Sequence, residues 1–540
     1  MPRRYRAGHR RLGVAGLGRL FRAAAIPLLL AACAVGPGDA PTGDALAQKM
    51  FATGYGHVAD KYLEPVSLAP LALAGLNGLR EIEPALAFDA QDGWVRATHR
   101  GAEVDRIAAP GDNDMDGWAR ATTRLMGAAR AASPRVGLTD QERLFEAVFA
   151  GALATLDGPS KYAGPARAER QRAARNGFGG IGVTIRVARD DEPSGPVLVD
   201  VMAGAPADRA GLWPGDRILA IDGAPTGNMT LDDAVDRLRG AAGSGLTLRV
   251  GRDGEPAREV ALIREHVIAP TVTYLRDGTI ARIVVSRFNQ GTARGVVAAL
   301  ERAEREIGHA LSGYVLDLRG NPGGLLDQAV TVADLFLVDG LIATTSGRHA
   351  GSNQTFRAGG TDFAGGLPLA VLINGRSASA TEVLAAALGN RGRGVLIGTT
   401  TYGKGTVQTV LALPNDGELT LTWSRLFGPA GRTMDGYGVL PAICTSAGPG
   451  KAGDLAGALR AGSEGLTAAR RLRARAADRT TEETTRRDRF RALCPPRDTL
   501  AEGEDLLARA LLADPRLYAR AVAQGVAAVA QTSAGDTRRP

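Results

Sequence analysis

The spacing of hydrophobic and polar residues changes character several times along the chain. From residue 45 to residue 176 the apolar positions recur mostly at helical spacing, and the clearest case is 138–156, where Thr139 is placed to cap a helix. The apolar residues of that helix share one face: Phe145, Val148, Phe149 and Leu153. We therefore expect a helical N-terminal region over residues 45–176.

The rest of the chain has three further patterns. Over 177–266, short alternating strands are separated by Gly, Pro and Asp turns, with two short helices among them, which predicts a small β-rich module. Over 267–446, strands alternate with amphipathic helices, which favours an α/β domain with a parallel sheet. Helical patterns return over 447–530, and the polar tail 531–540 is predicted to be disordered.

The N-terminus has the pattern of an export signal. Residues 1–32 contain seven Arg and no acidic residue, and they end in the apolar run 23–32, which is too short to cross a hydrocarbon core of about 30 Å as a helix. Leu-Ala-Ala-Cys at the end of this segment is similar to a bacterial lipobox, which predicts a lipid on Cys33 and a place on the periplasmic face of a bacterial membrane. An ordinary cleaved signal is the alternative. Residues 33–44 would then form a tether.

Composition excludes several classes of protein. The chain has 540 residues, of which 44% are hydrophobic and 23% charged, so it is neither wholly disordered nor a polytopic membrane protein. The formal charge of +8 is concentrated in residues 1–32, and the nearly neutral remainder lacks the basic surface of a nucleic-acid-binding protein. We expect no nucleic-acid partner, no cofactor and no metal. Arg outnumbers Lys by 60 to five, so a lysine between two glycines is notable.

Candidate catalytic residues lie within 370–413. A strand of buried type leads into a turn of small residues, where Ser379 precedes a helix that begins near Ala380. Ser379 and Glu382 form a capping-box pattern, which is a purely structural explanation. The same position suits a nucleophile, because a helix N-terminus stabilises a developing oxyanion. Lys404 is either an exposed turn lysine or, if burial lowers its pKa, the general base.

Three motifs together resemble the C-terminal processing peptidases, also called tail-specific proteases, which are serine/lysine endopeptidases with a PDZ domain. The family's DLRxNPGG run is present from Asp317, its NGxSASASE run lies at 374–382, and its FGKGxVQ run lies at 402–408. The resemblance implies a multidomain α/β protein, with a crotonase/ClpP-like α/β protease core, an inserted PDZ domain over 177–266, the peptidase domain over 267–446, and helical N- and C-terminal regions.

The resemblance also implies roles for individual residues. Ser379 would be the nucleophile, Lys404 its general base, and Gln408 would orient the lysine amine by a hydrogen bond. The oxyanion hole would consist of backbone amides from Ala380 and from Gly323 or Gly324. The carboxylate-binding loop of the PDZ domain would consist of Gly179, Gly180, Ile181, Gly182 and Val183. Substrates would then be proteins or peptides recognised by their C-terminal tails.

Some positions depart from the family pattern. Asn390 stands where many members have Asp, Thr381 replaces a Ser, and the stretch 156–162 lacks the usual His. Cys444 follows the stretch 438–443, where the family usually reads GIxPD. In an oxidising compartment Cys444 would form a disulfide with Cys494, although two buried thiols are equally compatible with the sequence.

Two other functions stay open at this point. One is a catalytically silent PDZ scaffold or adaptor that binds protein tails in the periplasm, against which the intact set of Ser379, Lys404 and Gln408 argues. The other is a crotonase-like acyl-CoA enzyme, which the export signal disfavours. A homodimer or an adaptor partner would most plausibly use the helical regions.

Overall fold

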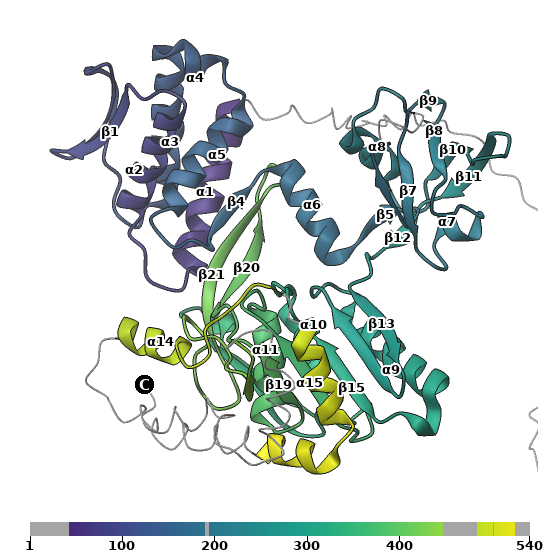
Figure 1. The fold of residues 1–540 in the computed structure, drawn as a ribbon. Coiled ribbons are helices and arrows are strands. Elements are labelled where there is room, and N and C mark those ends of the chain that lie inside the picture. The colour runs from purple at the N-terminus through teal and green to yellow at the C-terminus, as the bar shows by residue number, and fades with distance from the viewer. Residues whose placement is uncertain (1–42, 189–193, 447–482, 500–501, 524–540) are drawn as a thin grey trace, which may run out of the picture. The chain divides into compact units, whose positions relative to one another are not determined.

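The computed structural model describes residues 43–188, 194–446, 483–499 and 502–523 (Figure 1). The predicted export signal, Cys33, the tether and the tail 531–540 lie outside the described residues. No described helix is long and apolar enough to cross a membrane.

The N-terminal region is built on helices around an apolar core. These helices are α1 (Gly43–Lys61), α2 (Leu68–Gly78), η1 (Leu79–Glu81), α3 (Met115–Ala132), α4 (Pro134–Leu138), α5 (Gln141–Leu153) and α6 (Pro165–Asn176). The four residues predicted to share a face of α5 are all buried. The predicted cap was wrong by one residue, because Asp140 accepts the Arg143 amide (2.9 Å), while the Thr139 hydroxyl donates to the Arg135 carbonyl in α4 (2.7 Å).

The helical prediction for residues 45–176 missed an antiparallel sheet of three strands. These are β1 (Leu86–Gln91), β2 (Trp94–His99) and β3 (Ala102–Ala108). Asp92 and Gly93 connect the first two with φ values of +53° and +76°, which is the geometry of a two-residue hairpin turn. A short strand, β4 (Lys161–Ala163), also lies in this region and pairs with a strand of the α/β domain.

The β-rich module has its own apolar core. It contains β5 (Phe178–Gly180), β6 (Val183–Arg186), β7 (Val197–Val201), α7 (Pro206–Arg209), β8 (Arg217–Ile221), β9 (Ala224–Pro225), α8 (Leu231–Leu238), β10 (Gly245–Gly251), β11 (Arg258–Ile263) and β12 (Glu265–Val267). The main path of its sheet runs β11-β10-β8-β7-β6, so β6 is an edge strand, and β5 pairs separately with β12.

The centre of the α/β domain is a six-stranded sheet in the order β13-β14-β15-β18-β19-β22. Its strands are β13 (Val272–Asp277), β14 (Ile280–Val285), β15 (Gly313–Asp317), β18 (Leu369–Ile373), β19 (Val395–Gly398) and β22 (Ile443–Cys444). Only the β13–β14 pair is antiparallel. The buried strand β18 is apolar on both faces, and so is β15 up to its last residue, Asp317.

Helices cover both faces of this sheet. One face packs against α9 (Thr292–Ile307), α10 (Leu326–Asp334) and α11 (Ala380–Asn390), and the other packs against α15 (Glu502–Leu512). Alternate residues of β18 face the two layers, since Val371 joins the first core and Leu372 the second. Further helices of the described residues are η2 (Gly308–Ala310), η3 (Ala350–Ser352) and α14 (Glu483–Arg491), and residues 515–523 are helical as well.

A second sheet connects the α/β domain to the N-terminal region. It has the order β17-β16-β21-β20, from β16 (Gly340–Ser346), β17 (Gln354–Ala358), β20 (Thr406–Ala412) and β21 (Glu418–Phe427). Leu413, Leu419 and Leu421 at the end of the β20–β21 hairpin pack into the core of the N-terminal helices.

Candidate active site

Ser379 lies at a sharp turn between a buried strand and a buried helix. Strand β18 precedes the turn, and α11 begins at Ala380, as the sequence predicts. Ser379 has φ +57° and ψ −118°, a conformation that residues other than glycine rarely adopt. The turn leaves Ser379 half-buried at the N-terminus of α11, where free N–H groups and the helix dipole favour negative charge.

The Gly-Gly segment that follows β15 lies directly against this turn. Gly323 has φ +99°, and a Cβ built on it would lie 3.0 Å from Cβ of Ser379 and 3.1 Å from the amide nitrogen of Ala380, so only glycine fits there. The Gly323 amide donates to Oδ1 of Asn321 (2.9 Å). Among the hydrogen bonds of the described residues, none uses the amide of Gly324 or that of Ala380.

Glu382 joins the Ser379 turn to the loop that carries Lys404. Its side chain is completely buried, and each carboxylate oxygen accepts two hydrogen bonds. Oε2 accepts hydrogen bonds from the amides of Ser379 (2.7 Å) and Lys404 (2.8 Å). Because both amides bind the same oxygen, the distance between their nitrogens cannot exceed the sum of these two distances. Oε1 accepts from the Gly403 amide (2.7 Å) and the Thr401 hydroxyl (2.5 Å). Burial raises the pKa of Glu382, although these hydrogen bonds oppose the shift.

The residue predicted as a helix cap therefore has a second role. The Glu382 amide donates to the Ser379 carbonyl (2.8 Å), and its carboxylate accepts the Ser379 amide, as expected at the start of a helix. The bonds from Glu382 to the Lys404 loop are a contact that sequence spacing did not reveal.

Lys404 is half-buried in this loop, between β19 and β20. Burial lowers the pKa of Lys404 below its ordinary value, and the positive charge of Lys161 lowers it further, while Asp157 and Glu382 act in the opposite direction. A lowered pKa increases the fraction of neutral amine near neutral pH, and a neutral amine can accept a proton.

Gln408 lies on β20, four residues after Lys404. Its Nε2 donates to the hydroxyls of Thr406 (2.9 Å) and Thr422 (3.3 Å), and the Thr422 amide donates to Oγ of Ser160 (3.2 Å). These bonds fix the amide nitrogen of Gln408. No hydrogen bond within the described residues joins Gln408 to Lys404, so that contact stays a prediction.

A buried ionic cluster supports the glycine loop. Arg319 lies between Asp317 (2.7 Å) and Glu504 (2.9 Å) and also reaches Asp505 (3.2 Å), while Arg282 pairs with Asp317. Burial alone raises the pKa of Asp317, but the hydrogen bonds and charges of the two arginines hold it below its usual value. Glu504 and Asp505 belong to α15, and no sequence motif pointed to them.

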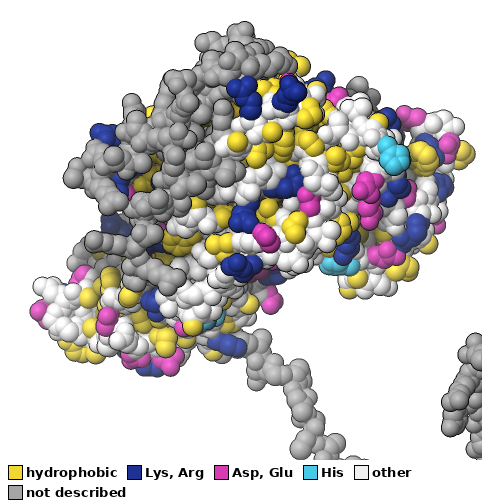
Figure 2. Space-filling model, turned by 90° about the horizontal axis from the view of Figure 1, so that it is seen from below, with side chains coloured by type: hydrophobic (Ala, Val, Ile, Leu, Met, Phe, Trp, Pro, Cys, Tyr) yellow, Lys and Arg dark blue, Asp and Glu magenta, His cyan; other side chains and the backbone are white. Residues whose placement is uncertain are grey.

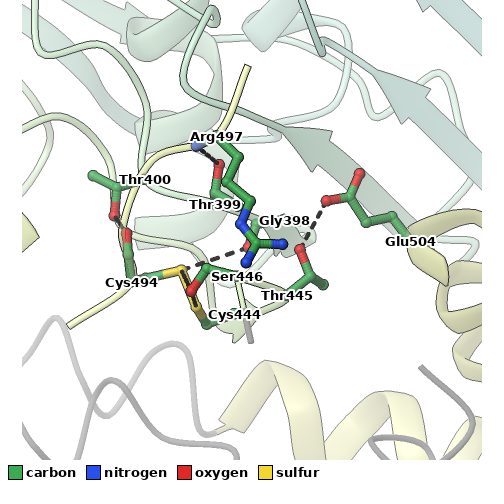
Figure 3. The surroundings of a disulfide bond; sticks show 9 residues. All are labelled: Gly398, Thr399, Thr400, Cys444, Thr445, Ser446, Cys494, Arg497 and Glu504. Carbon is green, nitrogen blue, oxygen red and sulfur yellow. Dashed lines mark hydrogen bonds between the residues drawn. A yellow bond between two sulfur atoms is a disulfide. The ribbon is translucent and has the colours of Figure 1, made fainter. Parts of the chain in front are cut away.

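Cys444 and Cys494 form a disulfide, which is one of the two states that the sequence left open (Figure 3). Cys444 is the last residue of β22, the edge strand of the central sheet. Cys494 is completely buried between this edge and the loop that follows β19. The disulfide therefore fastens a C-terminal segment close to the start of the Lys404 loop.

The predicted tail-binding residues form the passage from β5 into β6: Gly179, Gly180, Ile181, Gly182 and Val183. The outer edge of β6 is unpaired among the described strands, and α8 lies beside it. An open strand edge next to a helix is the arrangement in which a PDZ domain binds a peptide as an added strand. The Arg239 guanidinium stacks on the ring of Phe178 (4.4 Å) and brings a positive charge next to this passage.

The departures from the family pattern leave the Ser379 turn intact. Asn390 is the last residue of α11 and lies about 16 Å from Ser379 along the helix, which is too far for contact. The Thr381 hydroxyl donates to the Asn321 carbonyl (3.1 Å). Where the stretch 156–162 lacks its His, the Ser160 amide donates to Asp157 (2.7 Å) and closes the turn before β4.

Figure 2 shows one face of the molecule, on which basic and acidic side chains are interspersed among apolar ones. Charges of both signs at such short range cancel each other beyond about one Debye length, roughly 8 Å at physiological ionic strength. The described part of this face therefore presents no field of a single sign. The described residues contain no group of three or more His, Cys, Asp or Glu that could hold a metal ion.

Known protein families match two segments of this chain. The model of peptidase family S41 matches residues 279–445, and the model of the PDZ domain matches residues 171–251. The photosystem II D1 C-terminal processing protease, a solved structure, is 27% identical, with 56% of this chain and 80% of that chain covered and a TM-score of 0.31.

Two curated relatives extend the match beyond single domains. The carboxy-terminal-processing protease of Bartonella bacilliformis is 37% identical over 317 residues, which are 58% of this chain and 72% of that protein. The carboxy-terminal processing protease CtpA of Bacillus subtilis is 31% identical over 309 residues, which are 56% of this chain and 64% of that protein. The predicted family is confirmed: the chain belongs to the carboxy-terminal-processing proteases, serine peptidases of family S41 with a PDZ domain.

Proposed function

We propose that this serine peptidase is exported, is anchored by a lipid on Cys33 to the periplasmic face of a bacterial membrane, and cleaves proteins that it recognises by their C-terminal tails. In this proposal Ser379 is the nucleophile and Lys404 the general base. The amides of Ala380 and Gly324 form the oxyanion hole, because the Gly323 amide is already bonded to Asn321. Gln408 orients the lysine through its side-chain oxygen, since its nitrogen is held by Thr406 and Thr422.

The single observation that carries the catalytic assignment is the shared carboxylate of Glu382. It binds the backbone of Ser379 and that of Lys404 through one oxygen, and so brings two loops that are 25 residues apart in sequence to one place. A helix cap alone would need only the bond to Ser379. The additional bonds to Gly403 and Lys404 support a paired nucleophile and base.

The reaction would proceed by acyl transfer. The neutral amine of Lys404 takes the proton of the Ser379 hydroxyl as Oγ attacks the scissile carbonyl carbon, and the two backbone amides stabilise the resulting oxyanion. The Lys404 ammonium then gives its proton to the leaving amine, which leaves an ester on Ser379. Lys404 next accepts a proton from water as the water oxygen attacks the ester carbonyl carbon. The Lys404 ammonium then returns this proton to Ser379 Oγ as the ester bond breaks, which releases the new C-terminal carboxylate and restores the hydroxyl and the neutral amine.

Substrate selection would occur in the PDZ domain. The substrate tail would add a strand to the open edge of β6, with its terminal carboxylate at the amides of the passage from Gly179 to Val183. Arg239 places a positive charge on the same side, which favours a free carboxylate over an amide.

The assignment is tested with unfolded substrates that carry apolar C-terminal tails, free or amidated. Wild type should cleave the free-tailed substrate faster, and Ser379→Ala and Lys404→Ala should abolish cleavage but keep tail binding. Lys404→Arg should be inactive at every pH, because an arginine does not release its proton. Tail binding without cleavage by wild type would support a silent scaffold and contradict the peptidase mechanism.

The anchor is tested separately by metabolic labelling with a radioactive fatty acid. Wild-type protein should carry the label and fractionate with membranes. Cys33→Ala should lose both properties, and undiminished labelling of that variant would refute the lipid anchor.

A further inference from the structure

The segment 491–498, here called the clamp, lies along residues 399–402 of the loop that leads from β19 to Lys404. Figure 3 shows part of this contact, with Cys494 beside Thr400 and Arg497 beside Thr399. Each of these four loop residues forms a hydrogen bond with it. The bonds run from Thr400 Oγ1 to the Cys494 carbonyl (2.5 Å), from the Arg497 amide to Thr399 Oγ1 (3.1 Å), and from Arg491 Nη1 to the carbonyls of Thr401 (3.2 Å) and Tyr402 (3.0 Å). The clamp thus lies beside the first residues of the Lys404 loop and is hydrogen-bonded to each of them.

The clamp also touches the loop on the Ser379 side. The Gly375 amide donates to the Arg497 carbonyl (2.7 Å), and Nδ2 of Asn374 donates to the Asp498 carbonyl (3.4 Å). Oδ1 of the same asparagine accepts the Gly320 amide (2.9 Å) in the glycine loop. One segment near the C-terminus therefore contacts the elements that carry the base and the nucleophile.

The disulfide joins the clamp to the sheet edge beside the start of the Lys404 loop. Cys494 belongs to the clamp, and Cys444 pairs in register with Gly398, the residue from which the Lys404 loop departs. The two cysteines are 50 residues apart in sequence. The sulfur–sulfur bond is therefore the shortest covalent connection between the clamp and the sheet edge.

We propose that the Cys444–Cys494 disulfide positions the Lys404 loop through the clamp, so that its reduction lowers the peptidase activity and its reoxidation restores it. The proposal rests on the catalytic roles proposed above for Ser379 and Lys404. It makes the activity depend on the redox state of two cysteines that take no part in the reaction.

A dithiol can supply the electrons for the reduction. A thiolate of the dithiol attacks Sγ of the half-buried Cys444, because Cys494 is inaccessible, and Cys494 leaves as a thiolate that takes up a proton. The second thiol of the dithiol then attacks the dithiol's own sulfur in the mixed disulfide and releases Cys444 as a thiol. In sum, two electrons and two protons pass to the protein, and the dithiol becomes a disulfide.

Loosening the clamp would change the surroundings of Lys404. Burial and the charge of Lys161 hold its pKa down, while Asp157 and Glu382 raise it. Water that enters when the clamp separates weakens the effect of burial, so the pKa of Lys404 returns toward its ordinary value and less of the amine is neutral. The loop would also hold the amine less closely in the geometry that proton transfer needs.

The test uses the full chain with Cys33→Ala, in oxidised, dithiothreitol-reduced and reoxidised form, with thiols counted by alkylation and mass spectrometry. For a free-tailed peptide substrate, kcat/KM should fall about tenfold on reduction, its acid limb should move to higher pH, and both should recover on reoxidation. The chain with Cys444→Ala and Cys494→Ala added should have the kcat/KM of the dithiothreitol-reduced protein, and the reductant should not change it. Fully reduced protein with unchanged kcat/KM and pH profile would overturn the proposal.

A second variant keeps the test valid if reduction unfolds the protein, which circular dichroism would reveal. Arg491→Met leaves the disulfide in place but removes two bonds of the clamp, so it should lower kcat/KM and move the acid limb in the same direction. Arg516→Met, at an exposed arginine outside the clamp, is the matched control. Equal behaviour of these two variants would also overturn the proposal. Absence of cleavage by the oxidised chain would instead contradict the proposed catalytic residues.

Discussion

Ser379 and Lys404 are held in place in two different ways. Ser379 owes its position to its own backbone, which turns with φ +57° between a buried strand and the buried helix α11. Lys404 lies in a loop without such a helix. Two side chains from distant parts of the chain bind the backbone of this loop: Glu382 accepts hydrogen bonds from its amides, and Arg491 donates to its carbonyls. The nucleophile is therefore positioned locally, and the base is positioned by contacts between distant parts of the chain.

This difference predicts different sensitivities. A local turn between two buried elements keeps its shape as long as the domain is folded, because rotating it would expose the strand or the helix. A loop held by a few hydrogen bonds can shift while the domain stays folded. Substitutions around Lys404 should therefore reduce activity at small cost in stability, whereas substitutions at the Ser379 turn should affect both.

The largest effect is expected for Glu382→Gln, which breaks the connection between the two sides. Glutamine replaces one acceptor oxygen by an NH₂ group that faces two donors, so two hydrogen bonds are lost, at about 1–3 kcal/mol for each donor left unsatisfied. We expect kcat/KM to fall by about a hundredfold as the Lys404 loop moves. The measurement is steady-state cleavage of a tail peptide, combined with urea unfolding.

Glu418→Gln is the matched control for this variant. Glu418 is also a buried carboxylate, and it pairs with Arg175 (2.8 Å) and Arg172 (3.2 Å) at the far end of the β20–β21 hairpin. It should lose stability without a comparable loss of activity in the folded protein. Equal activity losses in the two variants would show that Glu382 matters only as a buried charge.

A smaller effect is expected for Gly323→Ala, which tests the Ser379 side. The added Cβ would lie 2.7 Å from the Ala378 carbonyl and 3.0 Å from Cβ of Ser379, so the turn must shift. We expect kcat/KM to fall about tenfold and the free energy of unfolding to fall by about 1–3 kcal/mol because of the strained φ. Thermal melts and peptide cleavage measure the two effects.

Gly320→Ala separates backbone strain from contact. Gly320 also has a positive φ, +74°, but a Cβ there would meet nothing within 4 Å. This variant should share the loss of stability and keep most of the activity. If both alanine variants lose activity to the same extent, the contact between Gly323 and Ser379 does not position the nucleophile.

The same division explains what could be predicted from the sequence. The strand, the turn and the start of α11 at Ala380 are neighbours in sequence, so their pattern predicts them directly. The contact from Arg319 to Glu504 spans 185 residues, and that from Thr400 to Cys494 spans 94, so no local pattern contains them. Long-range hydrogen bonds need the fold before they can be inferred.

The missed hairpin is a different kind of error. The Asp92-Gly93 pair lies between two alternating segments and is among the strongest short-range signals of a two-residue turn. The strands β1 and β2 could therefore have been predicted from the sequence. The helical periodicity on either side dominated the interpretation of the whole region. Asp140 was likewise available as a cap, one residue after Thr139.

The smallest effect concerns the charges around Lys404. Lys161, which pairs opposite Thr420 at the start of β4, is exposed, and its positive charge lowers the pKa of Lys404, whereas Asp157 raises it. Lys161→Gln should therefore raise that pKa, leave less neutral amine at a given pH, and move the acid limb of kcat/KM to higher pH. Asp157→Asn should move it to lower pH.

Both shifts should be below about one pH unit, because an exposed charge is screened by solvent, and added salt should reduce them further. A pH series of kcat/KM at two ionic strengths measures them. The opposite signs are decisive, because damage to the β4 turn would move both variants in one direction, whereas an electrostatic effect on the base must separate them. If the acid limb of kcat/KM moves in the same direction in both variants, the pKa of Lys404 depends on the shape of this turn and not on its charges.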